Sequence, residues 1–301
     1  MARISSESTP PQLLTCAFEA YGETNNIATS LRKLLKVHNA TDQDTTLVLE
    51  KPDFSIQTME APQVEPEEVL QAIRWKLKDL IDFDVGEALI DIFDVPQPAG
   101  SSRQAMVYVV VAEKSRLQEK TLLLQENNVQ LEAIDIPELT QRNIAEWLPE
   151  NEKGVALLAL GADHGLLTLT HQSTLYLSRQ LDFGYRELDR PQDGEDDGFS
   201  MVGLSPDLQR AMDQIVLEVQ RSLDYYESHF GLAPINSLII APLAIEVPGL
   251  VKYIESQLGV QVRLLDISTI LDWQEPVDRY RQAVCWSAIG AALRNDGIKQ
   301  V

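Results

Sequence analysis

The stretch 154–183 reads GVALLALGADHGLLTLTHQSTLYLSRQLDF, three apolar runs separated by two short turns. Runs rich in Leu, Val, Thr and Tyr that are bounded by turn residues are typical of β-strands. The turns at 161–164 and 171–172 are too short for a crossover connection, so neighbouring strands must run antiparallel. The stretch therefore predicts a three-stranded antiparallel meander.

Strands alternate with helices on both sides of this meander. The clearest helix begins at Ser205 and Pro206, an N-cap followed by proline at the first helical position, and stops at Gly231. Other helices are expected at 26–36, 67–81, 115–125, 137–147, 247–258 and 278–294, and other strands at 12–20, 45–50, 88–95, 106–112, 129–136, 237–241 and 260–266. The alternation predicts an α/β protein whose sheets are mostly covered by helices.

The composition excludes several classes of partner. The 301 residues include 46 Asp and Glu against 25 Lys and Arg, which gives a formal charge of −21. Nucleic acids and anionic lipid surfaces are themselves negative, so we expect no direct binding to either. The longest apolar run, 106–112, is far shorter than the ~18 residues of a membrane helix, and the N-terminus resembles no secretory signal. We expect a cytoplasmic protein in which Cys16 and Cys285 are free thiols.

Familiar catalytic and metal-binding patterns are absent from the sequence. It contains no P-loop, no glycine-rich dinucleotide motif, no nucleophile elbow and no HExxH motif. The acidic run 195–197 lies within a wider acidic segment, 187–203, and we interpret it as a solvated loop because cation ligands are usually spaced. We therefore predict no catalytic residue and no metal site.

One turn has features of a phosphate-binding hairpin. Gly161, Ala162, Asp163 and Gly165 follow the first strand of the meander, and a glycine-bounded turn can present backbone N–H groups to a phosphate. An ordinary β-turn is the commoner origin of the same spacing.

Trp75 is a candidate interface residue. It lies about 140° around the expected helix 67–81 from the stripe of leucines at 70 and 77, so its side chain is expected to point away from the local core. Exposed aromatic residues are common interface anchors. Packing beneath neighbouring strands is the alternative.

Several longer segments occur in an order typical of one family. They are EEVLQAIRWKLKDLIDFDVGEALIDIFDV (67–95), MVYVVVAEKSRLQEKTLLLQENNVQLEAIDI (106–136), VLEVQRSLDYYESHFGLAPINSLIIAP (216–242), VPGLVKYIESQLGVQVRLLD (247–266) and AVCWSAIGAALR (283–294). With them, nearly the whole chain resembles the PilM family of actin-like type IV pilus assembly proteins, most closely its MshI branch from MSHA (mannose-sensitive hemagglutinin) pilus biogenesis.

The resemblance implies an actin-like (ribonuclease H-like), two-lobed α/β fold related to that of FtsA. The first lobe would comprise 1–50 and 128–150. An inserted partner-binding subdomain would comprise 51–127, and the second lobe would comprise 151–301. In this family the first strand carries a Gly-Ile-Asp-Ile-Gly type sequence. The chain begins at what would be the following strand, so we expect that first strand to be missing.

The resemblance also implies a cofactor and a partner. The cofactor would be ATP with magnesium, bound between the lobes. The partner would be a bitopic inner-membrane pilus assembly protein, PilN-like or its MSHA equivalent, whose cytoplasmic tail docks on the inserted subdomain. We expect Trp75, Phe83 and Val109 to contribute to that contact.

The nucleotide elements depart from the family pattern. The second phosphate hairpin normally begins Asp-Ile-Gly, whereas this chain has Ala159 at the acidic position. The adenosine turn is normally glycine-rich, whereas here it contains Ala241 and Pro242, whose side chains oppose close approach of the backbone to a ligand. We therefore expect little ATP hydrolysis and weak nucleotide binding.

These features favour a scaffold located at the inner membrane through a protein partner. An active ATPase whose nucleotide state gates pilus assembly is one alternative, and an adaptor of type II secretion is another. A homodimer is also compatible with the sequence, because a meander that lacks its first strand exposes an unpaired edge.

Overall fold

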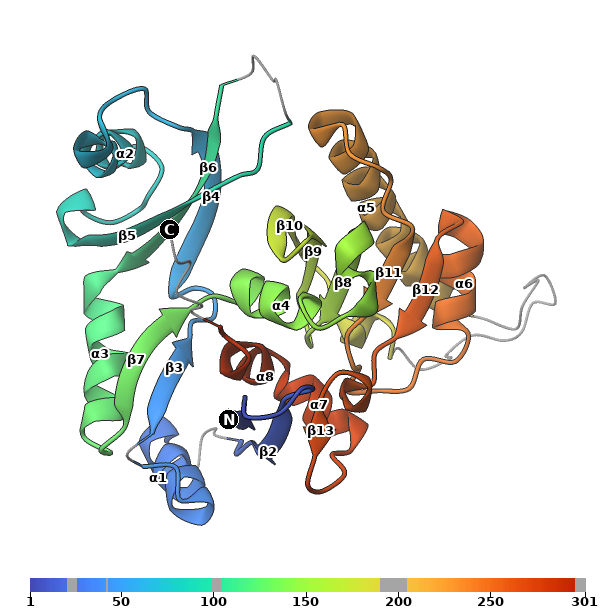
Figure 1. The fold of residues 1–301 in the computed structure, drawn as a ribbon, viewed down its shortest axis with the longest axis horizontal. Coiled ribbons are helices and arrows are strands. Elements are labelled where there is room, and N and C mark those ends of the chain that lie inside the picture. The colour runs from blue at the N-terminus through green and yellow to red at the C-terminus, as the bar shows by residue number, and fades with distance from the viewer. Residues whose placement is uncertain (21–25, 42, 99–103, 190–204, 296–301) are drawn as a thin grey trace. The chain divides into compact units, whose positions relative to one another are not determined.

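The computed structural model describes residues 1–20, 26–41, 43–98, 104–189 and 205–295, which form two compact units (Figure 1). Unit 1 consists of Met1–Phe18 and Glu138–Val301, and unit 2 consists of Glu19–Pro137. The predicted acidic loop lies outside the described residues from position 190 onward, and so does the acidic run 195–197.

The main sheet of unit 1 has five strands in the order β10-β9-β8-β11-β12. Its strands are β8 (Val155–Leu160), β9 (Gly165–His171), β10 (Thr174–Leu181), β11 (Ser237–Ile240) and β12 (Gln261–Leu264). The first three form an antiparallel meander, whereas β11 pairs in parallel with both β8 and β12. The predicted meander is therefore confirmed, and its first strand is the centre of the sheet.

Helices cover this sheet. They are α4 (Pro137–Ala145), α5 (Pro206–Phe230), α6 (Leu250–Leu258), α7 (Arg279–Val284) and α8 (Trp286–Ala292). The Ser205 side chain accepts the Leu208 N–H as an N-cap, and Gly231 ends α5 in the left-handed region with φ 62°, so the predicted boundaries of this helix are confirmed. The single helix expected at 278–294 is instead two helices that meet at Cys285.

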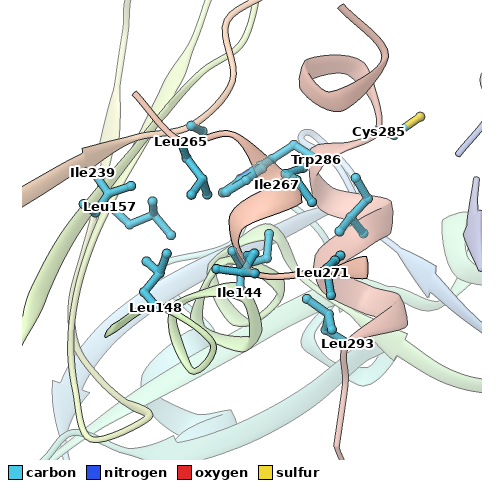
Figure 2. Packing of buried hydrophobic residues seen from close by; sticks show 14 of the residues in the cluster. Ile144, Leu148, Leu157, Ile239, Leu265, Ile267, Leu271, Cys285, Trp286 and Leu293 are labelled. Carbon is cyan, nitrogen blue, oxygen red and sulfur yellow. The ribbon is translucent and has the colours of Figure 1, made fainter. Parts of the chain in front are cut away.

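The largest described core cluster of unit 1 joins α4 and α8 to the sheet (Figure 2). Ile144 of α4, Leu157 of β8 and Ile289 of α8 are each fully buried. Full burial of a Leu or Ile side chain contributes roughly 1.5–3 kcal/mol, so these contacts are a major part of the stability of unit 1.

A second sheet of unit 1 has the order β1-β2-β13. Strands β1 (Ala2–Ser5) and β2 (Gln12–Cys16) form an antiparallel hairpin, and β13 (Asp272–Trp273) pairs in parallel with β2. The strand predicted for 12–20 is thus shorter than expected.

Unit 2 contains two small sheets. Strand β3 (Asp44–Val48) pairs in parallel with β7 (Gln130–Asp135), and their helices are α1 (Ile27–His38) and α3 (Lys114–Gln125). All five residues of β3 remain partly or fully exposed, and β7 is its only strand neighbour among the described residues.

The other sheet of unit 2 is antiparallel, with the order β4-β6-β5. Its strands are β4 (Phe54–Glu60), β5 (Ala88–Asp94) and β6 (Met106–Glu113), and helix α2 (Val69–Leu77) packs on one face. The apolar run 106–112, predicted as a strand, is β6, and residues on both of its faces are buried, with Val109 0% and Tyr108 4% exposed.

Two expectations for unit 2 were wrong. No strand was expected between Pro52 and Pro62, yet β4 lies there. The helix predicted for 67–81 is a 3-10 turn at Pro66–Glu68 followed by α2, which ends at Leu77. As a result Leu80 is exposed and does not belong to a buried stripe.

Candidate functional site

The turn between β8 and β9 is a tight hairpin. Strands β8 and β9 remain paired up to Leu160 and Gly165, and the Gly161 N–H donates to the His164 carbonyl at 2.8 Å. The structure therefore brings together the four residues of the predicted phosphate hairpin, Gly161, Ala162, Asp163 and Gly165.

A segment that follows β10 packs directly on this turn. The N–H of Tyr185 donates to the Gly161 carbonyl at 2.8 Å, and the N–H of Arg186 donates to the Ala162 carbonyl at 3.1 Å. A Cβ at Gly184 would lie only 2.5 Å from the carbonyl carbon of Ala162, so only glycine allows this close approach. The turn is thus held in shape by the protein's own backbone.

The carboxylate of the turn is already paired. The Arg186 guanidinium donates to both oxygens of Asp163, at 2.6 and 2.7 Å. Both side chains are more than half exposed, so this pair, made through a single guanidinium nitrogen, is screened by water and orients the groups more than it stabilises the fold. A magnesium ion would have to compete with Arg186 for Asp163, and Ala159 supplies no second acid.

The predicted adenosine turn is buried. Ala241 is 1% exposed, and its N–H donates to the Leu158 carbonyl at 2.8 Å. Pro242 is also buried and has no N–H to offer. These residues extend the parallel pairing of β11 and do not present a backbone to a ligand. Taken with the ion-paired Asp163, they do not fit magnesium-ATP.

We expect 5 mM magnesium-ATP to change the melting temperature of the chain by less than about 1 °C. A ligand present at ~100 times its Kd would stabilise the folded state by roughly 2.7 kcal/mol, which is a shift of several degrees. Differential scanning fluorimetry with magnesium alone as the control measures this directly. A saturable rise of several degrees would contradict the poor fit of these residues to the nucleotide.

Helix α2 has one buried apolar face and an exposed aromatic side chain on another face. Ile73 and Leu77 are fully buried, whereas Trp75 between them is 68% exposed. Phe83 packs at the margin of the same cluster. Val109 of β6 is fully buried in it, so its side chain offers no surface to a partner. Of the three predicted contact residues, only Trp75 is freely accessible.

Helix α4 carries a set of buried polar residues that the sequence patterns did not predict. Glu138, Thr140, Gln141 and Asn143 are each at most 2% exposed. The Gln141 amide donates to the carbonyls of its neighbouring strands, Leu157 and Leu166, and to the Thr168 hydroxyl. The sequence did contain a signal for these buried polar residues, because the helix lacks an apolar stripe and lies beside a buried strand. Polar side chains buried in this way need hydrogen-bond partners in the core.

The described residues hold neither a membrane-spanning helix nor a metal cluster. Within the described ranges no helix is both long and apolar enough to cross a bilayer. The same residues include no cluster of three or more His, Cys, Asp or Glu suited to a metal ion.

Comparison with known proteins finds solved structures that are similar to this chain. No protein-family model matches the sequence, and no curated protein matches it. A chain of a PilM-PilN type IV pilus biogenesis complex is similar over 97% of this chain and 94% of its own, with a TM-score of 0.72 and 16% identity.

Two further solved structures show weaker similarity. The cytoplasmic domain of EpsL, an inner membrane component of the type II secretion system of Vibrio cholerae, covers 98% of this chain and 97% of its own, with a TM-score of 0.41 and 14% identity. A Bacteroides thetaiotaomicron protein with an actin-like ATPase fold covers 84% and 81%, with a TM-score of 0.44 and 8% identity. The likeness to the PilM-PilN chain, together with the sheet order β10-β9-β8-β11-β12, shows that this chain has the predicted mixed α/β, actin-like fold.

Proposed function

We propose that this protein is a scaffold of type IV pilus biogenesis, of the MSHA type, that binds the cytoplasmic tail of a PilN-like bitopic inner-membrane protein. Residues 51–127 would be the partner-binding subdomain, and 1–50 with 128–150 and 151–301 would be the two actin-like lobes. The protein would act at the cytoplasmic face of the inner membrane without itself hydrolysing ATP. The observation that carries the proposal is the exposure of Trp75 on a helix whose other face is fixed in a core.

The rigidity of α2 supports an anchoring role for Trp75. Arg74 donates to the Val85 carbonyl at 2.9 Å, and Lys76 donates to the Glu60 carbonyl at 2.9 Å. Buried Ile73 and Leu77 hold the same helix from below. A pre-positioned indole loses little conformational entropy on binding, which is the property of an interface anchor.

The sheet beside α2 limits where an extended tail can pair. Strand β6 is central and has both edges occupied by β4 and β5, so it cannot accept a further strand. Strands β4 and β5 are the two edges of this sheet among the described residues, and the segment that contains Phe83 leads into β5. We therefore propose that the tail adds to β5 as an extra strand and contacts Trp75.

Charge supports recruitment through a protein and not through lipid. At −21, the chain would be repelled by an anionic membrane surface. Location at the membrane would then depend on the tail of the bitopic partner.

We expect the Trp75→Ala variant to bind the cytoplasmic peptide of the PilN-like partner about 5- to 30-fold more weakly than the natural chain. Loss of an aromatic anchor typically costs ~1–2 kcal/mol, and 1.4 kcal/mol is tenfold in affinity. The exposed position of Trp75 means that folding is little affected. Isothermal titration calorimetry with the synthetic tail peptide measures the change.

Two control variants test whether the loss of affinity is specific to the surface around Trp75. Tyr280→Ala removes another aromatic side chain that is 47% exposed, on α7, and should leave the affinity unchanged. Asp163→Ala removes the ion-paired acid of the hairpin and should also leave it unchanged. Unchanged affinity for Trp75→Ala would remove Trp75 from the interface, and lost affinity for Asp163→Ala would favour an ATPase-like site at the hairpin.

A further inference from the structure

The two cysteines of the chain meet in unit 1 although 269 positions separate them. Cys16 ends β2, and Cys285 lies between α7 and α8. The Cys16 Sγ donates to the Arg281 carbonyl at 3.7 Å, and the same carbonyl accepts the backbone N–H of Cys285 at 3.0 Å. Both residues therefore converge on a single acceptor.

The two thiols also lie close enough to shift the pKa of each other. The hydrogen bond with Cys16 lowers the pKa of the Cys285 thiol to about 7 against the effect of burial, with help from the N-terminal ammonium and then from the charge of Arg281. The same bond and burial raise the pKa of the Cys16 thiol. One sulfur is thus the readier thiolate and the other keeps its proton, which is the arrangement that favours nucleophilic attack by the first.

The two cysteines differ in how far they are buried. Cys285 is 1% exposed and belongs to the core cluster, and its sulfur points away from the labelled aliphatic side chains (Figure 2). Cys16 is only partly buried. A small oxidant therefore reaches the buried Cys285 sulfur only by passing the partly exposed Cys16, on the side of β2 and away from the aliphatic core.

We propose that Cys16 and Cys285 form a reversible disulfide when hydrogen peroxide is the oxidant. The Cys285 thiolate attacks one peroxide oxygen, the O–O bond breaks, and the released hydroxide takes up a proton to give water and a Cys285 sulfenic acid. The Cys16 sulfur then attacks the Cys285 sulfur, the S–O bond breaks, and water leaves with the Cys16 proton. Two thiols and one peroxide give one disulfide and two waters.

The bond would join the N-terminal hairpin to the C-terminal helices of unit 1. Strand β2 already packs against this region through Leu13, which is buried in the core cluster with Trp286 and Ile289 of α8. After β2, Phe18 makes an edge-on ring contact with Tyr280 of α7. A covalent link between residues so distant in sequence restricts the unfolded chain strongly. The oxidised protein should therefore be more resistant to unfolding than the reduced protein.

The test is peroxide treatment of the full chain, followed by intact mass, a free-thiol count and thermal unfolding. We expect a loss of two hydrogen atoms, no free thiol, a monomer on a non-reducing gel and a melting temperature higher by about 5 °C, all reversed by dithiothreitol. The Cys16→Ser variant, changed at the more exposed position, should lose the stabilisation and show no loss of two hydrogens.

Each contrary result overturns the proposal. Disulfide-linked dimers would show that the cysteines pair between molecules. Addition of oxygen atoms to one cysteine with the other still free would show that the sulfurs do not reach each other. Two free thiols after treatment would show that the pair does not react with peroxide.

Discussion

Replacement of Gly290 by alanine is expected to destabilise unit 1 by about 3 kcal/mol. Gly290 lies on α8 where this helix crosses α4, and an added Cβ would lie 2.7 Å from the carbonyl carbon and 2.9 Å from the Cβ of Thr140. The obstructing atoms are mostly backbone, which cannot rotate away. The Gly290 carbonyl also accepts the buried Asn143 amide at 3.0 Å, so separating the helices would break that bond as well.

Thermal and urea unfolding followed by tryptophan fluorescence measure this loss. Trp286 lies one turn before Gly290 on α8, so its signal reports on the affected region. In a chain of this size, 3 kcal/mol lowers the melting temperature by roughly 6–12 °C. Ser287→Ala on the same helix changes a half-exposed position and should remain within ~0.5 kcal/mol of the natural chain. An unchanged melting temperature for Gly290→Ala would mean that α4 and α8 can move apart at little cost.

Replacement of Gln141 by methionine is expected to cost about 2–4 kcal/mol. Methionine has nearly the same length, so the loss comes from hydrogen bonds and not from a cavity. The change removes the amide partner of the Thr168 hydroxyl at 3.0 Å and the acceptor of the Trp286 indole at 3.5 Å. Each buried polar group left without a partner costs ~1–3 kcal/mol.

The matched comparison is Gln257→Met on α6, where the glutamine is exposed. That variant should unfold within ~0.5 kcal/mol of the natural chain, measured by the same urea titration. If Gln141→Met is as stable as Gln257→Met, the buried amide contributes no net stability and an apolar core would serve equally well at this position.

Local patterns were enough to predict the elements whose stabilising contacts are close in sequence. The meander of β8, β9 and β10 follows from its apolar runs and short turns, and α5 follows from its cap at Ser205 and its stop at Gly231. The exposure of Trp75 follows from helical periodicity. In each case the determining neighbours lie within one element or one turn.

The features that were missed depend on contacts between distant segments. Strand β4 has Ser, Gln, Thr and Glu along its length, and it forms a strand because it pairs with all seven facing residues of β6. The break at Cys285 and the polar core around Gln141 likewise depend on segments distant in sequence. The short contacts of Gly184 with the hairpin have no local signal, because a glycine after a strand is ordinary in any loop.

The features of the candidate site also divide into those that the sequence predicted and those that depend on contacts between distant segments. Local patterns located the hairpin at Gly161, whereas the degenerate positions Ala241 and Pro242 came from the family resemblance. The local patterns did not indicate that Arg186 neutralises Asp163, because that pair depends on how the chain returns after β10. They also gave Val109 as a contact residue, although its side chain is buried against Ile73 and Leu77 of α2, a helix distant in sequence.

The exposed strand β3 has a consequence for the behaviour of the protein in concentrated solution. Strand β7 is its only strand neighbour among the described residues, and a strand edge of this kind is a template on which another copy could pair unless repulsion between copies opposes it. The net charge of −21 supplies that opposition as long-range repulsion, which salt weakens because the screening length falls to ~3 Å at 1 M. Repulsion between like charges therefore keeps copies of this chain apart, and we expect the protein to remain dispersed in buffer of low ionic strength.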